Sequence, residues 1–221
     1  MKKLTFICLL ILVSLSAFSQ MAVGIEAGAS IFNVTRAVPG ISIPGFSLGS
    51  KEIFGFNAGA VAEIKIWKGF NFRPEFGFEQ KGAKLTSDII SYTVPGRYTI
   101  NYLCLPLNVT YNYTLGPGKI FAGLGPELGY GLNGKGKGDN GQTVKLKMDG
   151  KDISTTSSEL HLKPLDYGVS FIAGYKLEKG FLLSGGYFLG LADIDPDKDF
   201  TWKNHGFTIN VGYFFYQKNM N

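Results

Sequence analysis

The stretch at 102–132 constrains the fold more than any other, because its apolar residues recur at every second position. Neighbouring side chains of an extended chain point to opposite faces, so a period of two predicts β-strands. The alternation runs twice, on either side of a short turn at 116–118. The two runs share an apolar face made of Leu103, Leu105, Leu107, Val109, Tyr111, Tyr113, Ile120, Ala122, Leu124, Pro126, Leu128, Tyr130 and Leu132. We therefore predict two neighbouring strands with one apolar side.

The other face of the second run carries mostly small residues. It carries Phe121, Glu127 and the glycines 123, 125, 129 and 131. In a soluble sandwich the apolar face would form the core, and the wet face would be rich in Lys, Thr and Glu. Glycine in that place indicates a crowded interior. An apolar outside around a small-residue, sparsely charged inside is typical of a β-barrel in lipid.

The N-terminus has the features of an export signal. Lys2 and Lys3 precede an apolar run at 4–15, and small residues lead to Ser19. We predict a signal peptide at 1–19 and one outer-membrane β-barrel domain at 20–221. A membrane-anchoring helix is the alternative, and the run is short for a span of about 20 residues. Cleavage leaves Cys104 as the one cysteine, so no intramolecular disulfide is expected.

Alternating segments follow one another along the mature chain, and their connections are by turns long and short. Outer-membrane barrels have this asymmetry, with short periplasmic turns and long outer loops. We therefore predict an all-β fold, an eight-stranded antiparallel up-and-down transmembrane β-barrel. The predicted strands are 20–33, 53–66, 70–81, two within 102–132, 164–177, 181–193 and 204–216.

Two details follow from this arrangement. Aromatic residues at the strand ends near the short turns are expected to form a lower girdle at the membrane interface. These are Trp67, Phe70, Tyr113, Phe181 and Tyr216. The longest connection, 133–163, is predicted to be a loop with a small hairpin around 148–151.

Several segments together resemble the PorT-like outer-membrane β-barrel domain family, which is broadly similar to the small OmpA-type barrels. They are YLCLPLNVTY at 102–111, FAGLGPELGYGL at 121–132, DYGVSFIAGYKL at 166–177, GGYFLGLADI at 185–194 and VGYFF at 211–215. The resemblance covers essentially the whole mature chain and implies an eight-stranded barrel. The family mostly lacks an assigned activity, and a few of its members are linked to protein secretion and gliding machinery.

Two positions depart from the family's pattern. Cys104 stands where similar sequences often carry an acidic residue, so one charge expected inside the barrel is missing. The tail at 217–221 follows the last aromatic strand, so the chain does not end on an aromatic assembly signal.

Six acids and four bases are predicted to face the barrel interior. They are Glu26, Glu63, Lys65, Arg73, Glu75, Glu79, Lys81, Glu127, Asp166 and Lys176. We interpret them as a plug of buried ion pairs, which is stable only where both partners are present. The alternative is a polar path for a small solute, but eight strands leave just enough room for side chains. No open pore is therefore expected.

Catalytic and metal chemistry have weaker support in the sequence. The histidines, His161 and His205, lie near predicted outer loop ends, and aspartates alternate at 193, 195, 197 and 199. A His/Asp hydrolytic site or a calcium-binding loop is conceivable there. The glycine and distal glutamate of a calcium-binding hand are lacking, so we interpret the aspartates as part of a solvated turn. No enzyme activity, cofactor or metal is predicted.

The functional prediction is an integral outer-membrane protein with a structural or interaction role, for which the resemblance suggests an association with protein secretion or envelope assembly. Its partners would be outer-membrane lipid and, through the outer loops, lipopolysaccharide or envelope and secretion proteins. The formal net charge of +5 falls to +3 without Lys2 and Lys3, which gives no reason to expect nucleic acid. The alternative is a secreted soluble barrel of lipocalin type, which would carry an apolar ligand inside.

Overall fold

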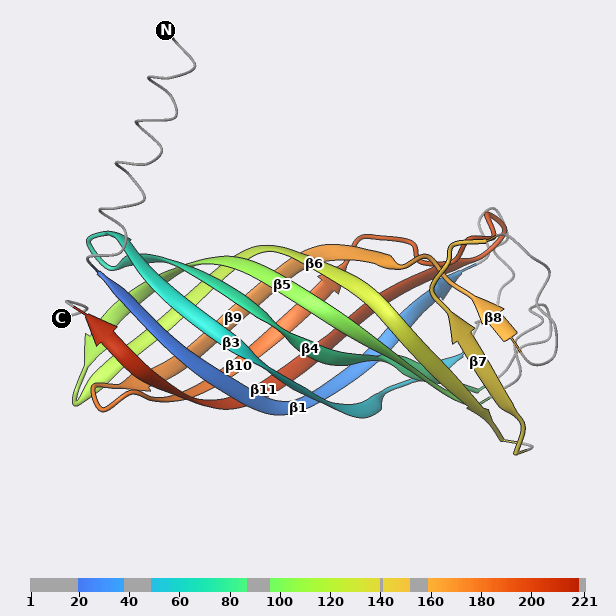
Figure 1. The fold of residues 1–221 in the computed structure, drawn as a ribbon, viewed down its shortest axis with the longest axis horizontal. Coiled ribbons are helices and arrows are strands. Elements are labelled where there is room, and N and C mark those ends of the chain that lie inside the picture. The colour runs from blue at the N-terminus through green and yellow to red at the C-terminus, as the bar shows by residue number, and fades with distance from the viewer. Residues whose placement is uncertain (1–19, 38–48, 87–95, 140, 152–158, 219–221) are drawn as a thin grey trace, which may run out of the picture.

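The computed structural model describes residues 20–37, 49–86, 96–139, 141–151 and 159–218. The predicted signal peptide at 1–19 lies outside the described residues. The described strands belong to one eleven-stranded sheet, which closes on itself as a long barrel (Figure 1). Among the described residues, no helix is long and apolar enough to cross a membrane.

Eight long strands form the barrel wall, and each pairs antiparallel with the next wall strand in the chain. Pairing of the first with the last closes the ring, from Met21 opposite Lys218 to Ala37 opposite Thr201. This confirms the predicted eight-stranded up-and-down barrel. The wall strands are β1 (Met21–Ala37), β3 (Ile53–Trp67), β4 (Phe70–Leu85), β5 (Gly96–Leu115), β6 (Gly118–Gly138), β9 (Leu165–Leu177), β10 (Phe181–Gly190) and β11 (Thr201–Lys218).

The short turns lie together at one end of the barrel, where β1 also starts and β11 also ends (Figure 1). Each turn contains a glycine with positive φ, namely Gly69, Gly116 and Gly180. Glycine adopts this conformation without steric cost, which makes such tight connections accessible. This end is the periplasmic end, and the long connections lie at the opposite, outer end.

The wall presents an apolar face outward. Every wall strand exposes a large apolar side chain, for example Ile25, Phe56, Phe76, Val109, Leu124, Phe171, Leu183 and Ile209. Water would oppose this exposure, whereas the hydrocarbon of a bilayer accepts it. A soluble lipocalin-type barrel needs its apolar face inward, so the structure does not favour that alternative.

The predicted lower girdle is present at the periplasmic end. Its members Trp67, Phe70, Tyr113, Phe181 and Tyr216 are all exposed. The rings of Trp67 and Phe70 stack with centroids 6.3 Å apart, and the Phe181 and Tyr213 rings lie 5.1 Å apart. Amphipathic aromatic rings are favoured at the level of the lipid headgroups, so this girdle marks the periplasmic surface of the membrane.

Two strands are much longer than a bilayer requires. β5 has 20 residues and β6 has 21, whereas about 9–11 residues cross a membrane. Toward the outer end of the barrel, their outward residues change from apolar to polar. On β5 the change comes before Leu103 in the sequence, and on β6 it comes after Leu132. We call the part beyond this change the outer extension. It comprises 33–37, 82–85, 96–101, 133–138 and 201–205 of the wall, the connections at 162–164 and 191–200, and the short strands β2 (Ser50–Lys51), β7 (Thr143–Lys147) and β8 (Glu159–His161).

Two predictions about the longest connection are wrong. β6 does not end at Leu132 but continues to Gly138. Its alternation continues as well, since Lys135 and Lys137 point outward while Gly136 points inward. A Cβ on Gly136 would lie 2.6 Å from the Tyr98 ring, so only glycine lets this ring pack there. β7 pairs back onto β6, and β8 runs parallel to β7. The described strands that flank 148–151 are therefore not the two arms of a hairpin.

The interior of the outer extension is filled with apolar side chains, which we call the outer plug. Trp202, 1% exposed, meets the Tyr98 ring edge-on at 6.1 Å. Residues from the wall, from β7 and β8 and from both described outer connections take part. The buried members are Val34, Ala83, Leu85, Tyr98, Ile100, Tyr102, Cys104, Val144, Leu146, Leu160, Leu162, Ala192, Ile194 and Trp202. The outer mouth of the barrel is thus filled by a hydrophobic core.

Candidate functional site

The ionisable side chains of the lumen gather in three clusters below the outer plug. The one nearest the periplasmic end joins β9 to β3 across the interior. Lys176 Nζ lies 2.6 Å from Glu63 Oε2, and Asn112 donates a hydrogen bond to the same carboxylate. Both partners are buried, so each charge depends on the other for its stability.

The second cluster is built around Arg73 on β4. Its Nη2 donates to Glu26 Oε2 at 3.0 Å, and its Nε donates to Glu75 Oε1 at 2.9 Å. The guanidinium also lies 5.0 Å from the centre of the Phe121 ring and 5.8 Å from that of Phe214. Arginine suits this position because its planar group can bind two carboxylates and lie over aromatic faces at the same time.

The third cluster surrounds Lys81, whose side chain is fully buried. Its Nζ lies 2.8 Å from Glu127 Oε1, 3.6 Å from Glu79 Oε2 and 3.7 Å from Asp166 Oδ2. The ammonium is also 3.5 Å from the centre of the Phe188 ring, a cation–π contact. One cation therefore holds three carboxylates from β4, β6 and β9 together.

The structure thus places nine of the ten candidate residues in these three clusters. Lys65 lies elsewhere, in a recess at the periplasmic end that Lys68, Asn71 and Lys119 also line. Lys65 is two residues from the end of β3, so its side chain reaches the periplasmic opening of the barrel and not the closed interior.

Sequence reasoning missed the neutral partners of these charges. Asn204 on β11 donates a hydrogen bond to Asp166 at 2.9 Å. Phe32, Tyr102 and Phe188 surround the Lys81 ammonium. All four lie on the inward faces of their strands, so the period of two identifies their direction. Their meeting at one level depends on the tilt of strands that are distant in sequence.

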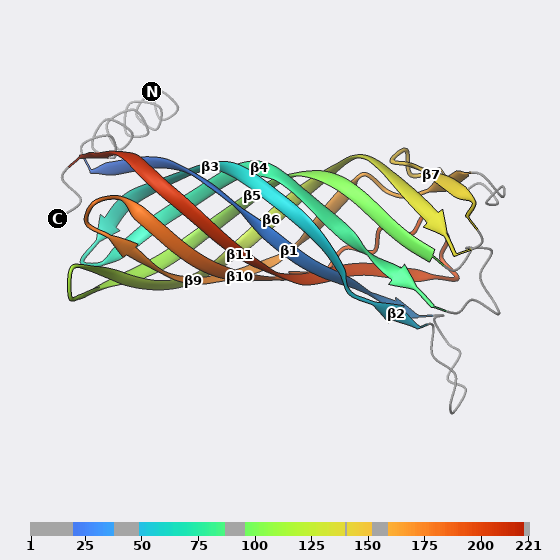
Figure 2. The ribbon, with the colours of Figure 1, turned by 90° about the horizontal axis from the view of Figure 1, so that it is seen from below.

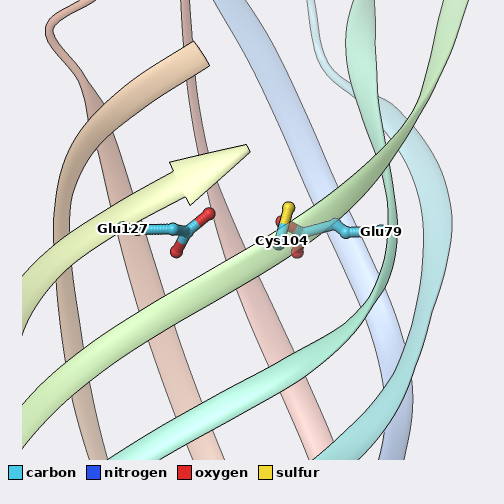
Figure 3. A group of neighbouring side chains, drawn as sticks. All are labelled: Glu79, Cys104 and Glu127. Carbon is cyan, nitrogen blue, oxygen red and sulfur yellow. The ribbon is translucent and has the colours of Figure 1, made fainter. Parts of the chain in front are cut away.

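A group with metal-ligand chemistry lies beside Lys81. Ligand atoms of Glu79, Cys104 and Glu127 all lie within 4.8 Å of one another, and the Cys104 sulfur is 3.7 Å from Glu79 Oε2 (Figure 3). Two carboxylates and a thiol can bind a divalent cation. Lys81 already contacts both carboxylates, so its ammonium supplies the positive charge that a metal ion would bring.

A cavity of about 80 Å³ separates the Arg73 and Lys81 clusters. Glu26, Glu75, Glu79 and Glu127 line it, together with the amides of Asn108 and Asn210. A polar cavity needs roughly 10–15 Å³ to hold one water molecule, so this cavity has room for several. The amide of Asn108 has no hydrogen-bond partner in the described protein, so it is free to bind such water. The cavity therefore suits bound water.

The acidic residues of the outer connection act within their own turn. Asp193 Oδ1 accepts hydrogen bonds from the backbone N–H groups of Asp195 and Trp202. The carboxylates of Asp195 and Asp197 each accept one from the residue two positions on. Burial raises the pKa of Asp195 to about 6. These contacts account for the alternation of aspartates without a bound metal.

The histidines are in different surroundings. His161 Nδ1 and Asp149 Oδ1 are 2.7 Å apart, and the hydrogen bond between them lowers the pKa of Asp149. His205 Nδ1 and Thr35 Oγ1 are 3.4 Å apart on the outward side of β11 and β1. The His/Asp pairing conceivable from the sequence, His205 with the aspartates at 193–199, is not among these contacts.

An apolar outer face, an aromatic girdle, short periplasmic turns and a lumen closed by ion pairs define an outer-membrane β-barrel. Residues 16–196 match the family model described as the outer membrane protein beta-barrel domain, and the chain belongs to this family. It is accordingly an outer-membrane protein. No curated protein matches the sequence.

Solved structures of other outer-membrane proteins are similar to the chain at low sequence identity. The outer membrane protein OprG from Pseudomonas aeruginosa is 13% identical, with a TM-score of 0.50 over 90% of this chain and 97% of that chain. Ail of Yersinia pestis, solved with the heparin analogue sucrose octasulfate, is 13% identical, with a TM-score of 0.42 over 89% and 99%. The Neisserial surface protein A is 12% identical, with a TM-score of 0.43 over 86% and 97%.

Proposed function

We propose that this chain is a closed anchor in the outer membrane, akin to PorT-like barrels, whose outer extension meets lipopolysaccharide or proteins of an envelope or secretion assembly. The mature protein in this proposal is 20–221, after removal of a signal peptide at 1–19. The ten lumen residues named above serve to stabilise the barrel, and none of them is catalytic.

One observation carries the proposal: the barrel is filled inside and continues outside. The outer plug and the three ion-pair clusters occupy the interior, which argues against transport. β5 and β6 nevertheless extend well past the level at which their outward faces stop being apolar. A long, ordered wall above the lipid has no use in anchoring alone, so contact with other envelope components is the function that it supports best.

Fractionation of cells that express the full chain tests the membrane part of the proposal. We expect the protein in the outer-membrane fraction, with a gel mobility that changes on boiling, as closed barrels show. Purified protein in planar bilayers should give no steady conductance. Recovery as a soluble protein with an apolar ligand would overturn the proposal in favour of the carrier, and a stable conductance would overturn the closed lumen.

Site-specific photo-crosslinking in intact cells tests the interaction part. A crosslinking residue in place of Thr143, which is exposed on β7, should trap lipopolysaccharide or an envelope protein. The matched control is Lys179, which is exposed in a periplasmic turn. Products from Thr143 that are absent from Lys179 support the proposal. The same products at both positions, or none at Thr143, would contradict it.

A further inference from the structure

A row of cationic side chains crosses four adjacent strands of the outer extension. Lys51 on β2 lies opposite Lys84 on β4, Lys84 opposite Arg97 on β5, and Arg97 opposite Lys137 on β6. Directly opposite residues share a face of the sheet. Lys51, Arg97 and Lys137 are exposed, and the Lys84 side chain is 45% exposed, so this is the outward face.

A second cationic group adjoins this row. Lys135 on β6 lies opposite Lys145 on β7, and Lys147 follows two positions later on the same strand. The strands concerned are side by side at the outer end of the barrel (Figure 2). We call the two groups together the cationic face: Lys51, Lys84, Arg97, Lys135, Lys137, Lys145 and Lys147.

Few carboxylates balance this face among the described residues. Lys84 Nζ lies 3.2 Å from Asp139 Oδ1, and Lys147 Nζ lies 2.7 Å from Glu159 Oε2. The Arg97 guanidinium also donates to the backbone carbonyl of Phe54, which is uncharged. Like charges directly opposite one another destabilise a sheet. The two carboxylates leave the face with a net positive charge, so a bound anion would stabilise this part of the sheet.

The position of the face indicates which anion this is. The same outward side of β4, β5 and β6 carries the lipid-facing residues Phe78, Leu103 and Tyr130. A strand that rises about 3.3 Å per residue and tilts by about 40° climbs on the order of 15 Å from Leu103 to Arg97. The phosphorylated sugars of a lipopolysaccharide, whose acyl chains pack against the apolar residues below, extend above the hydrocarbon to about that height.

We propose that the cationic face binds the phosphate groups of lipopolysaccharide in the outer leaflet, while the apolar residues below it contact the acyl chains. Lysine and arginine are the usual partners of phosphate, through charge-assisted hydrogen bonds. This inference rests on the proposed outer-membrane location and adds a defined site to it. The face fixes the height and orientation of the bound lipid, and in turn the lipid neutralises the row of cations.

Binding to purified mature protein in detergent tests the site. The probes are a phosphorylated rough lipopolysaccharide and the same preparation after enzymatic dephosphorylation. The double variant Arg97→Gln with Lys137→Gln should bind the phosphorylated probe about tenfold more weakly, because two charge-assisted contacts are lost. The wild type should bind the dephosphorylated probe with a similar loss, and added salt should weaken only the phosphate-dependent part.

The matched control is Lys179→Gln with Lys218→Gln, which removes the same number of charges from exposed residues at the periplasmic end. It should bind like the wild type, and heat-modifiable mobility of both variants checks that the barrel is closed. Equal binding by the Arg97/Lys137 variant and the wild type would overturn the site. So would tighter binding of a soluble sulfated polysaccharide than of lipopolysaccharide. Failure of the outer-membrane proposal would appear separately, in fractionation.

Discussion

The two parts of the barrel are opposite in polarity. In the membrane-spanning part the wall is apolar outside, and the interior holds the charged clusters of Arg73, Lys81 and Lys176. In the outer extension the wall carries the cationic face outside, and the outer plug fills the interior. The same strands run through both parts. The outward residues therefore match their surroundings, which are lipid in one part and water in the other. The inward residues of the same strands have the opposite polarity.

The difference also teaches how each part is stabilised. The outer extension is surrounded by water, so burial of apolar side chains drives its packing as in a soluble protein. The spanning part gains little from such burial, because lipid tails are themselves apolar. Paired charges and hydrogen bonds hold its interior beside a small apolar cluster that includes Phe121 and Phe214, and each ion pair is costly to break.

The largest expected effect comes from Lys81→Met. The variant leaves Glu79, Glu127 and Asp166 buried together without their cation. Loss of one partner of a buried ion pair costs about 3–5 kcal/mol, so the free energy of unfolding in detergent should fall by at least that much. Urea titration followed by gel mobility measures it. Lys179→Met, at an exposed turn position, is the control, and an equally small change in both variants would contradict the role given to Lys81.

Trp202→Ala tests the other side of the comparison. It removes the largest side chain of the outer plug and should cost about 3 kcal/mol, within the range for buried aromatic truncations. The damage should stay in the outer extension, because the spanning part has its own interior. Hydrogen exchange should therefore increase at Tyr98 and Leu146 but not at Phe121 or Phe214. Uniform loss of protection along the barrel would show that the two parts are not independent.

A smaller effect is expected from pH at the outer connection. Burial raises the pKa of Asp195 to about 6, above its ordinary value. An acid with a raised folded-state pKa stabilises the fold at low pH, and this stability is lost as the pH rises from about 4 through 6. The turn at 193–199 should open more readily at pH 7 than at pH 5, by on the order of 1 kcal/mol, since the carboxyl group is partly exposed. Hydrogen exchange at Trp202 measures this, and Asp195→Asn should abolish the pH dependence.

The smallest effect should come from Asp139→Asn. The Lys84–Asp139 pair is exposed on both sides, so its loss should change the free energy of unfolding by less than about 0.5 kcal/mol. The contrast with Lys81 isolates the effect of burial on an ion pair. A cost above 1 kcal/mol in the same urea titration would contradict this expectation. It would show that Asp139 is needed to offset the repulsion between the cations of the cationic face.

The direction of each side chain in the spanning part was predictable from the sequence. Ile120, Leu124 and Leu128 alternate with Phe121, Gly125 and Gly129, and the structure places these two sets outside and inside. This follows from the geometry of any extended chain and needs no knowledge of its neighbours. The strand number, the short turns and the girdle followed from the same alternation.

The outer extension was much less predictable. The NGKGKG stretch at 133–138 has low β-propensity and reads as a loop, yet it is strand because β5 and β7 pair with it and because Gly136 makes room for Tyr98. The inward residues Tyr98 and Ile100 lie between the predicted strands at 70–81 and within 102–132, where no strand was predicted. Their burial depends on connections that fold back into the mouth of the barrel.

The sequence by itself therefore determined the class of fold and the inward or outward direction of residues in the lipid, because both depend on a local period. Only the tertiary structure decided that Lys81 meets Glu127 and Asp166, that Trp202 packs on Tyr98, and that four cations align across β2, β4, β5 and β6. Those meetings depend on the register and tilt of paired strands, and neither quantity is contained in the residues of one strand alone.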